Sequence, residues 1–153
     1  MSVIAQPFKG ALEALISQKI NWMDDDIKVM LLDDTEEPDL LTDTVIGDVE
    51  ANEISGQNYA AGGQPLGTKS IDDGTNPADT TITLKAANSE WTDATITAHY
   101  GIIYNNTEHD GDKVLIGMVD FGENKSVAGG IFRIAWADGV VIKMIGASIG
   151  SST

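Results

Sequence analysis

Two histidines and several clusters of acidic residues are the side chains of this sequence that could do acid–base or metal chemistry. His99 falls within a predicted strand, and His109 lies in a polar loop over residues 105–112. A histidine acts as a catalytic base only when it is held beside a nucleophile, and neither histidine belongs to a Ser-His-Asp or Cys-His motif. The chain has no cysteine, which excludes disulfides, thiolate zinc sites and cysteine nucleophiles. Both histidines are therefore expected to be structural or surface residues.

The acidic clusters could offer carboxylate oxygens to a calcium ion. They are Asp24, Asp25 and Asp26; Asp33 and Asp34 with Glu36 and Glu37; Asp72 and Asp73; and Glu108 with Asp110 and Asp112. Residues 106–111 imitate the opening of an EF-hand loop, but Gly117 stands where its last glutamate should be, and a strand rather than a helix follows. Solvated loop charge is the expected state of these clusters. A pair of carboxylates for glycoside hydrolysis is defined by its spacing in the fold, which sequence does not give.

Other motifs that would indicate an enzyme are missing. The glycines form neither a phosphate-binding P-loop nor a dinucleotide-binding turn. Trp22, Trp91 and Trp136 are far apart in the sequence, and we expect them to pack in the core or at an interface rather than to stack on a ligand. The sequence therefore predicts no enzyme, with no catalytic, cofactor-binding or metal-binding residue and no cofactor.

Composition limits the partners. The chain has 153 residues, a mass of 16.2 kDa and a formal charge of −15, from 9 basic and 24 acidic residues. Nucleic-acid phosphates and anionic membrane surfaces would repel such a protein, so we expect neither as a partner. No basic segment followed by an apolar run begins the sequence, and no apolar window is long enough to span a membrane. The protein is expected to be soluble and to be made in the cytoplasm.

One amphipathic helix is predicted near the N-terminus. Its apolar stripe consists of Phe8, Leu12, Leu15, Ile16 and Ile20. Gly10 weakens the first turn, so the firm part of the helix is expected over residues 11–19. An acidic loop over residues 33–43, an ambiguous segment over 43–54 and a glycine-rich loop over 56–63 follow a buried strand at 27–32.

From residue 66 onward the pattern is that of β-structure. Strands are predicted over residues 68–71, 80–86, 95–104, 114–121, 131–136 and 140–145. Asp138-Gly139 stands between the last two and predicts a hairpin that pairs them. One helix followed by short strands with turn-rich connections predicts a mainly β fold, a β-sandwich or barrel with a short N-terminal helix in the α+β class.

The length fits one domain. We expect an N-terminal arm over residues 1–7, a single β-rich domain over 8–146 and a flexible C-terminal tail over 147–153. The residues expected in the core are Leu12, Leu15, Leu31, Ile82, Leu84, Ile96, Ile102, Leu115, Val119, Phe132 and Ile134.

Three stretches carry a resemblance to a known family. The first runs from Lys-Gly-Ala-Leu at 9–12 through Ile-Asn-Trp at 20–22 to Asp-Ile-Lys-Val-Met-Leu-Leu at 26–32. The second joins Val-Glu-Ala-Asn-Glu-Ile-Ser-Gly at 49–56 to Tyr-Ala-Ala-Gly-Gly at 59–63. The third consists of Trp91, Ala-Thr-Ile-Thr-Ala-His-Tyr-Gly-Ile-Ile-Tyr at 94–104, and Leu-Ile-Gly-Met-Val-Asp-Phe-Gly at 115–122. Over roughly residues 8–145, the chain resembles a family of small structural proteins of tailed bacteriophages.

The resemblance implies a virion component and assigns no functional residue. The leading hypothesis is a capsid decoration (cement) protein on the outside of the head, where a charge of −15 does not face the packaged genome. Its partners would be the lattice of the major capsid protein and further copies of itself, most simply in a trimer. A tail or tail-tip component, a carbohydrate- or receptor-binding β-sandwich module, and a hydrolase with unrecognised carboxylates are the alternatives.

Two segments are expected to become ordered only on assembly. Residues 1–6 are apolar but precede the helix, where a free terminus normally frays. The loop over residues 56–63 offers Tyr59 as an exposed aromatic side chain. We expect contacts with neighbouring subunits of a small ring to order both segments.

Overall fold

A computed structural model describes residues 2–72 and 81–145 of the chain, and the expected tail over 147–153 lies outside this part. Its elements are β1 (Ser2–Val3), β2 (Gln6–Pro7), α1 (Lys9–Ile16), β3 (Ile27–Leu32), the 3-10 turns η1 (Ile46–Asp48) and η2 (Glu50–Asn52), β4 (Gln64–Pro65), β5 (Ser70–Asp72), β6 (Thr81–Lys85), β7 (Ser89–Asn105), β8 (Leu115–Trp136) and β9 (Val140–Ile145). The prediction of a mainly β fold with one short helix near the N-terminus is confirmed. No helix in these two ranges has the length and apolar character to span a membrane.

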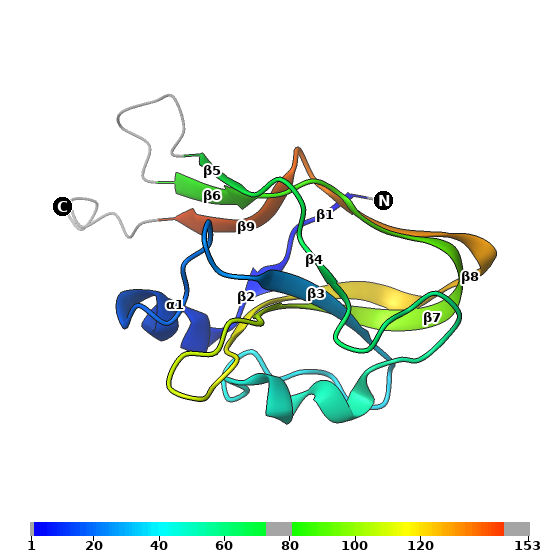
Figure 1. Cartoon of the computed structure of the whole chain (residues 1–153), viewed down its shortest axis with the longest axis horizontal. Helices are drawn as coiled ribbons and strands as arrows, with labels where there is room; N and C mark the ends of the chain where they lie inside the picture. The colour runs from blue at the N-terminus through cyan, green and yellow to red at the C-terminus, as the bar shows by residue number, and fades with distance from the viewer. Residues whose placement is uncertain (1, 73–80, 146–153) are drawn as a thin grey trace.

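The strands form two sheets. The larger, six-stranded sheet has the order β1-β8-β7-β3-β4, and β2 also pairs with β8. The smaller sheet has the order β5-β6-β9 and lies above the larger one in Figure 1. The strand predicted over residues 27–32 is β3, which pairs antiparallel with β7 so that Met30 lies opposite Ile102. All of β3 except Lys28 is buried, as a strand covered on both faces requires.

A long bent hairpin of β7 and β8 dominates the larger sheet. The strands expected separately over residues 114–121 and 131–136 are parts of one strand of 22 residues that begins at Leu115, and β7 begins at Ser89 instead of residue 95. The register between them shifts at several points, and Gly122 and Gly129 have φ values of 78° and 63°. Bulges and positive φ bend a strand without ending it, so the hairpin curves from one layer to the other (Figure 1). We call residues 121–131 the β8 bend.

Most of the expected core is confirmed. Leu31, Leu84, Ile96, Ile102, Leu115, Val119, Phe132 and Ile134 are buried, and Leu15 is partly buried against them. Trp22, Trp91 and Trp136 are also buried, in agreement with the packing role expected for them.

Leu12 and Ile82 are wrong predictions, since they are 50% and 42% exposed. Helix α1 buries Ala11 and Ala14 instead, so the face with the smallest side chains lies against the domain. Ile82 is on the same face of β6 as the buried Leu84, but two cross-strand pairs nearer the end of the small sheet.

Helix α1 is also shorter than predicted. It ends at Ile16 because Gln18 adopts a left-handed conformation, with φ of 63°. The backbone N–H groups of Gln18 and Lys19 then donate to the carbonyl oxygens of Leu15 and Ala14, which is the hydrogen-bond pattern of a Schellman motif. Glycine usually takes this position, so the sequence carries no signal for the stop.

The predicted hairpin of residues 131–136 with 140–145 is wrong, although its turn is present. Asp138 and Gly139 have φ values of 54° and 78°, as a tight two-residue turn requires. Beyond the turn, Ala137 pairs with Val140, but β8 and β9 do not pair further among the described residues. β9 pairs with β6 instead.

The expected N-terminal arm is part of the sheet in the single chain. β1 pairs in parallel with Ala135 and Trp136 of β8, and β2 pairs with Met118 and Gly117 at the other end of the same strand. Between β1 and β2, the N–H of Ala5 donates to the carbonyl of Val141 in β9. Residues 2–7 therefore connect the two sheets within one chain.

Candidate functional site

The first acidic cluster forms a structural clamp. Asp25 Oδ2 accepts hydrogen bonds from the backbone N–H of Asn21, from Asn105 Nδ2 and from His109 Nε2, at 2.9, 2.7 and 2.9 Å. Burial alone would raise the pKa of Asp25, but these hydrogen bonds outweigh it and lower the pKa. The backbone carbonyl of Asp25 also accepts a hydrogen bond from Lys69. This carboxylate ties together segments that are far apart in sequence.

The loop that imitates an EF-hand closes on itself. His109 and Asp112 exchange both backbone hydrogen bonds, and the two residues between them have positive φ. Asp110 points into solvent, 3.9 Å from Lys19 Nζ. In the described ranges, which leave out Asp73, no group of three or more acidic or histidine side chains converges as a metal site would require.

The other histidine, His99, contacts an amide and a carboxylate. Its Nδ1 lies 3.0 Å from Asn124 Oδ1, and its Nε2 lies 3.6 Å from Asp120 Oδ1. Its ring packs on Tyr100, with centroids 4.5 Å apart. The structure thus places the two histidines in separate clusters, and the partners of both are carboxylates and amides rather than a hydroxyl nucleophile.

A cluster of tyrosines and one glutamate, which sequence reasoning missed, holds the loop over residues 56–63. Tyr59 Oη donates to Glu53 Oε2 at 2.8 Å and accepts from the backbone N–H of Leu31 at 2.8 Å. Glu53 Oε2 also accepts from the N–H of Gly62, whose carbonyl accepts from Tyr104 Oη at 2.6 Å. The expectation that Tyr59 is an exposed aromatic is therefore wrong.

Burial and the neighbouring carboxylate of Glu53 keep the hydroxyls of this tyrosine cluster protonated. Burial raises the pKa of Tyr104 to about 12 and raises the pKa of Tyr59 further. A tyrosine that serves as a general base needs the opposite shift, toward the working pH. Gly63 comes directly after Gly62 in the sequence. A side chain at Gly63 would collide with the backbone carbonyl of Val29 on β3. The Tyr-Ala-Ala-Gly-Gly motif thus fastens the loop to the central strand.

A polar hollow of about 410 Å³ lies between residues 53–55 and β7, beside Asp33. Two carboxylates in one hollow raise the question of hydrolysis. Both already hold hydrogen bonds within the chain: Glu53 as above, and Asp33 Oδ1 from the backbone N–H of Thr35 at 2.9 Å. These bonds hold the loops that form the hollow.

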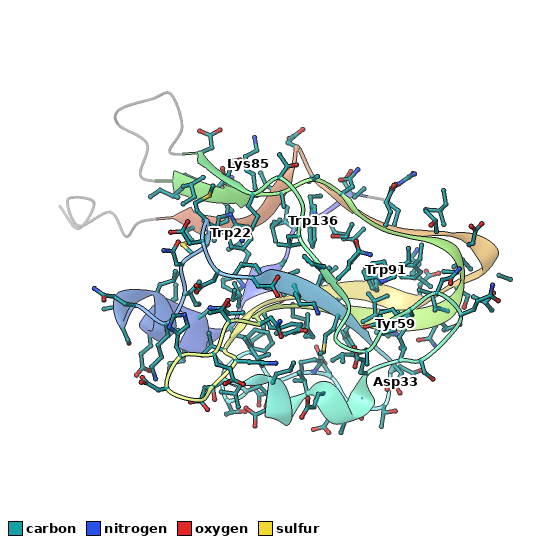
Figure 2. The ribbon with its side chains drawn as sticks, in the orientation of Figure 1. Trp22, Asp33, Tyr59, Lys85, Trp91 and Trp136 are labelled. Carbon is teal, nitrogen blue, oxygen red and sulfur yellow. The ribbon has the colours of Figure 1, made fainter. Side chains whose placement is uncertain are left out.

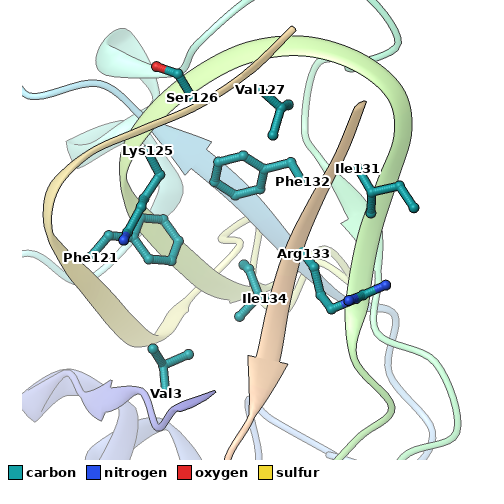
Figure 3. A pocket seen from close by; sticks show the side chains of 9 residues that line it. All are labelled: Val3, Phe121, Lys125, Ser126, Val127, Ile131, Phe132, Arg133 and Ile134. Carbon is teal, nitrogen blue, oxygen red and sulfur yellow. The ribbon is translucent and has the colours of Figure 1, made fainter. Parts of the chain in front are cut away.

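The β8 bend encloses a second cavity, of about 260 Å³, and this is the candidate site (Figure 3). Apolar side chains from β1 and from both arms of β8 line it: Val3, Phe121, Val127, Phe132 and Ile134. Such a cavity suits an apolar group. Sequence reasoning missed the cavity because it forms where one strand bends back toward itself. The glycines in the bend are the signal that could have indicated it.

The floor of the cavity is rigid. Phe121 packs edge-on against Phe132, Phe132 against Trp91, and Trp91 against Tyr59, with ring centroids 5.8, 6.0 and 5.9 Å apart. Figure 2 shows Tyr59 and Trp91 together inside the curve of the hairpin. Because Tyr59 is itself hydrogen-bonded to β3, this aromatic row connects the cavity to the centre of the sheet.

Two of the nine basic residues flank the cavity. Lys125 projects from the bend beside Phe121, whereas the Arg133 side chain points away from the cavity (Figure 3). The Lys125 ammonium lies 4.0 Å from Glu123, at the limit of an ion pair, and the Glu123 side chain is well exposed, so the ion pair is weak. Arg133 is bound more closely to Glu90 of β7. Lys125, which lies beside the cavity, is thus loosely held.

No family model, curated protein or solved structure matches this chain.

Proposed function

We propose that this protein is a structural component of a tailed bacteriophage virion, and specifically a decoration protein bound to the outside of the head. The motifs that resemble such proteins support the proposal, because each has a structural role in the fold. They supply β3, the loop that Glu53 and Tyr59 hold, and the β7–β8 hairpin. A family defined by its framework rather than by a catalytic group would keep residues of this kind.

The observation that carries the proposal is the β8 bend: an exposed strand with an apolar cavity, built on a buried aromatic row. A rigid support under an exposed apolar site is the arrangement of a protein-binding surface. In contrast, the hydrogen bonds of the polar clusters in the described part of the chain join loops to one another. The charge of −15 favours the outer face of a shell, because packaged DNA would repel the protein on the inner face.

The test is addition of the purified protein to preformed heads that lack it. We expect saturation at a fixed ratio to the major capsid protein, with density on the outside of the shell by electron microscopy. A few copies located on the tail would replace the decoration role with that of a tail component. Saturable binding to isolated glycans without binding to heads would favour the receptor-binding module.

The proposal includes assembly into a small ring, with a trimer as the expected form. This part rests on the resemblance to decoration proteins. Light scattering of the purified protein measures its mass directly, against 16.2 kDa for one chain. A monomer that also binds heads singly would remove the ring from the proposal and leave the decoration role.

A further inference from the structure

One edge of β8 is covered at both ends and open between them. β7 lies along the other edge throughout. On the open side, β2 covers residues 117 and 118, and β1 covers residues 135 and 136. Among the described residues, no strand pairs with this edge from 119 to 134. An open strand edge presents unpaired N–H and C=O groups to another chain.

The part of this edge next to β1 suits strand addition. The N–H of Ala137 donates to the carbonyl of Val3, so the backbone groups of residue 137 point toward β1. Backbone groups alternate along a regular strand, and those of Arg133, which lies opposite Glu90 of β7, therefore point to the same side. The pairing with β7 is irregular at Ile131, between the pairs of Phe132 with Trp91 and of Gly130 with Ala94, and Ile131 is 50% exposed. The pairing of β1 with residues 135 and 136 thus shows how a strand can pair with this edge, and no described strand continues that pairing over residues 131–134.

The cavity lies directly beside this edge. Phe132 and Ile134 alternate with the edge residues and form one wall, and Val3 of β1 forms the end. The volume of about 260 Å³ exceeds the roughly 150 Å³ of an apolar cavity that accepts benzene. A strand placed on the edge would direct alternate side chains inward, and one large apolar side chain would fill the space.

Lys125 adds a charge preference. Its weak, exposed contact with Glu123 costs little to exchange for another carboxylate. A partner segment with an acidic residue near its apolar side chain would therefore be favoured over a basic one.

We propose that residues 131–134 and the adjoining cavity bind an extended segment of a partner protein by β-strand addition. The segment places one large apolar side chain in the cavity and a carboxylate near Lys125. Main-chain hydrogen bonds supply affinity in this mode, and the pocket supplies specificity. The inference rests on the proposed function only in taking the partner to be another virion protein.

The opposing interpretation is an edge protected against pairing. Lysines, glycines and bulges are devices that keep strand edges from adding other chains, and the β8 bend contains all of them. The two interpretations differ at residues 131–134, which lie beyond the glycines of the bend, so the test is directed there.

The probe is a fluorescein-labelled, blocked peptide of sequence Thr-Val-Thr-Phe-Thr-Glu, titrated onto the purified protein and followed by anisotropy. Arg133→Pro removes an edge N–H, and Arg133→Thr is its matched control because it also loses the ion pair with Glu90 but keeps that N–H. Val127→Trp fills the cavity. We expect Arg133→Pro to bind about fivefold more weakly than Arg133→Thr, and Val127→Trp to bind about tenfold more weakly than wild type.

Replacing the peptide's Phe with Ser should weaken binding by about tenfold or more, since a buried aromatic side chain is lost. Absence of saturable binding to wild type, or equal binding by all the variants, overturns the inference. Circular dichroism and thermal unfolding confirm that each variant is folded before it is compared.

The same variants separate this inference from the proposed function. If wild type, Arg133→Thr and Arg133→Pro decorate heads equally, the edge is not the docking site and the decoration role stands. If none of them decorates heads, the proposed function fails, and the peptide titration still decides whether the edge binds a strand.

Discussion

The two halves of β8 are one continuous strand in opposite surroundings. From Leu115 to Val119 every residue is buried, because β7 pairs with one edge, β2 meets the other, and the rest of the chain covers both faces. From Gly122 to Ile131 every residue is exposed or half-buried, and one edge has no partner among the described residues. The first half lies in the core of the domain, and the second lies at its surface.

The two halves of β8 show how the residue types of a buried strand segment differ from those of an exposed one. The buried half reads Leu-Ile-Gly-Met-Val, with no polar residue, as a strand covered on both faces should. The exposed half reads Gly-Glu-Asn-Lys-Ser-Val-Ala-Gly-Gly, with charges and glycines that bend it. A strand prediction that treats both halves alike loses this difference.

The largest effect that tests the comparison is expected from truncating one large apolar side chain in each half. Leu115→Ala should lower the free energy of unfolding by about 2–5 kcal/mol, because it leaves a cavity in a fully buried site. Ile131→Ala should change it by less than about 0.5 kcal/mol, because its side chain is half exposed. Urea unfolding measures both values. Equal losses at the two sites would mean that the halves do not differ in structural role.

Deleting residues 2–6 should have the next largest effect. The deletion removes β1, the buried Ala5 and its hydrogen bond to Val141, and part of β2, so the free energy of unfolding should fall by about 2–3 kcal/mol. Thermal or urea unfolding is the measurement. Ile4→Ser is the matched control, because it changes an exposed side chain and keeps the pairing. An unchanged melting profile on deletion would return these residues to the role of an arm ordered by neighbours.

The smallest effect concerns the clamp at Asp25, which holds the loop leading into the buried half of β8 through Asn105 and His109. Asp25→Asn should destabilise the protein by about 1 kcal/mol at neutral pH, since charged hydrogen bonds are lost. The folded-state pKa of Asp25 lies below the ordinary 3.8. Its stabilisation is therefore present above that value and is lost as the pH falls through the folded-state pKa.

Unfolding of wild type and Asp25→Asn across the acidic range measures this dependence. The difference between them should shrink as the pH falls below about 3.8. Asp110→Asn is the control, because that carboxylate is exposed and lies 3.9 Å from the ammonium of Lys19. A difference that stays constant with pH would show that the charge of Asp25 does not contribute.

Local patterns could be predicted from the sequence, and they were correct where the chain's immediate neighbours decide the conformation. Three features depend on residues that are close together in the sequence. They are the apolar run of β3, the alternation in β7 of buried Ile96 and Ala98 with their exposed neighbours, and the tight turn at Asp138 and Gly139. Their physical causes are the two-residue period of a strand and the few residues that accept positive φ. The mainly β class follows from the same patterns.

Predictions that needed a distant partner were wrong or missing. Ile16 continues the apolar stripe of α1 but is 85% exposed, because the alanine face of the helix packs on the domain. The sequence predicted Tyr59 to be an exposed aromatic side chain. In the fold, its hydroxyl is instead hydrogen-bonded to Glu53 and to the backbone N–H of Leu31. No period or propensity along the chain specifies which face of an element meets which neighbour.

The sequence by itself therefore determined the strands, the turns, the acidic charge and the apolar residues available for a core. Tertiary structure alone decided that β9 pairs with β6, that His109 meets Asp25 across 84 residues, and that β8 bends around a cavity with one edge open. The physical reason is the distance along the chain over which each kind of interaction acts. Turn chemistry and strand periodicity act over a few residues, whereas edge pairing and cavity shape depend on how all the elements compete to bury the same apolar surface.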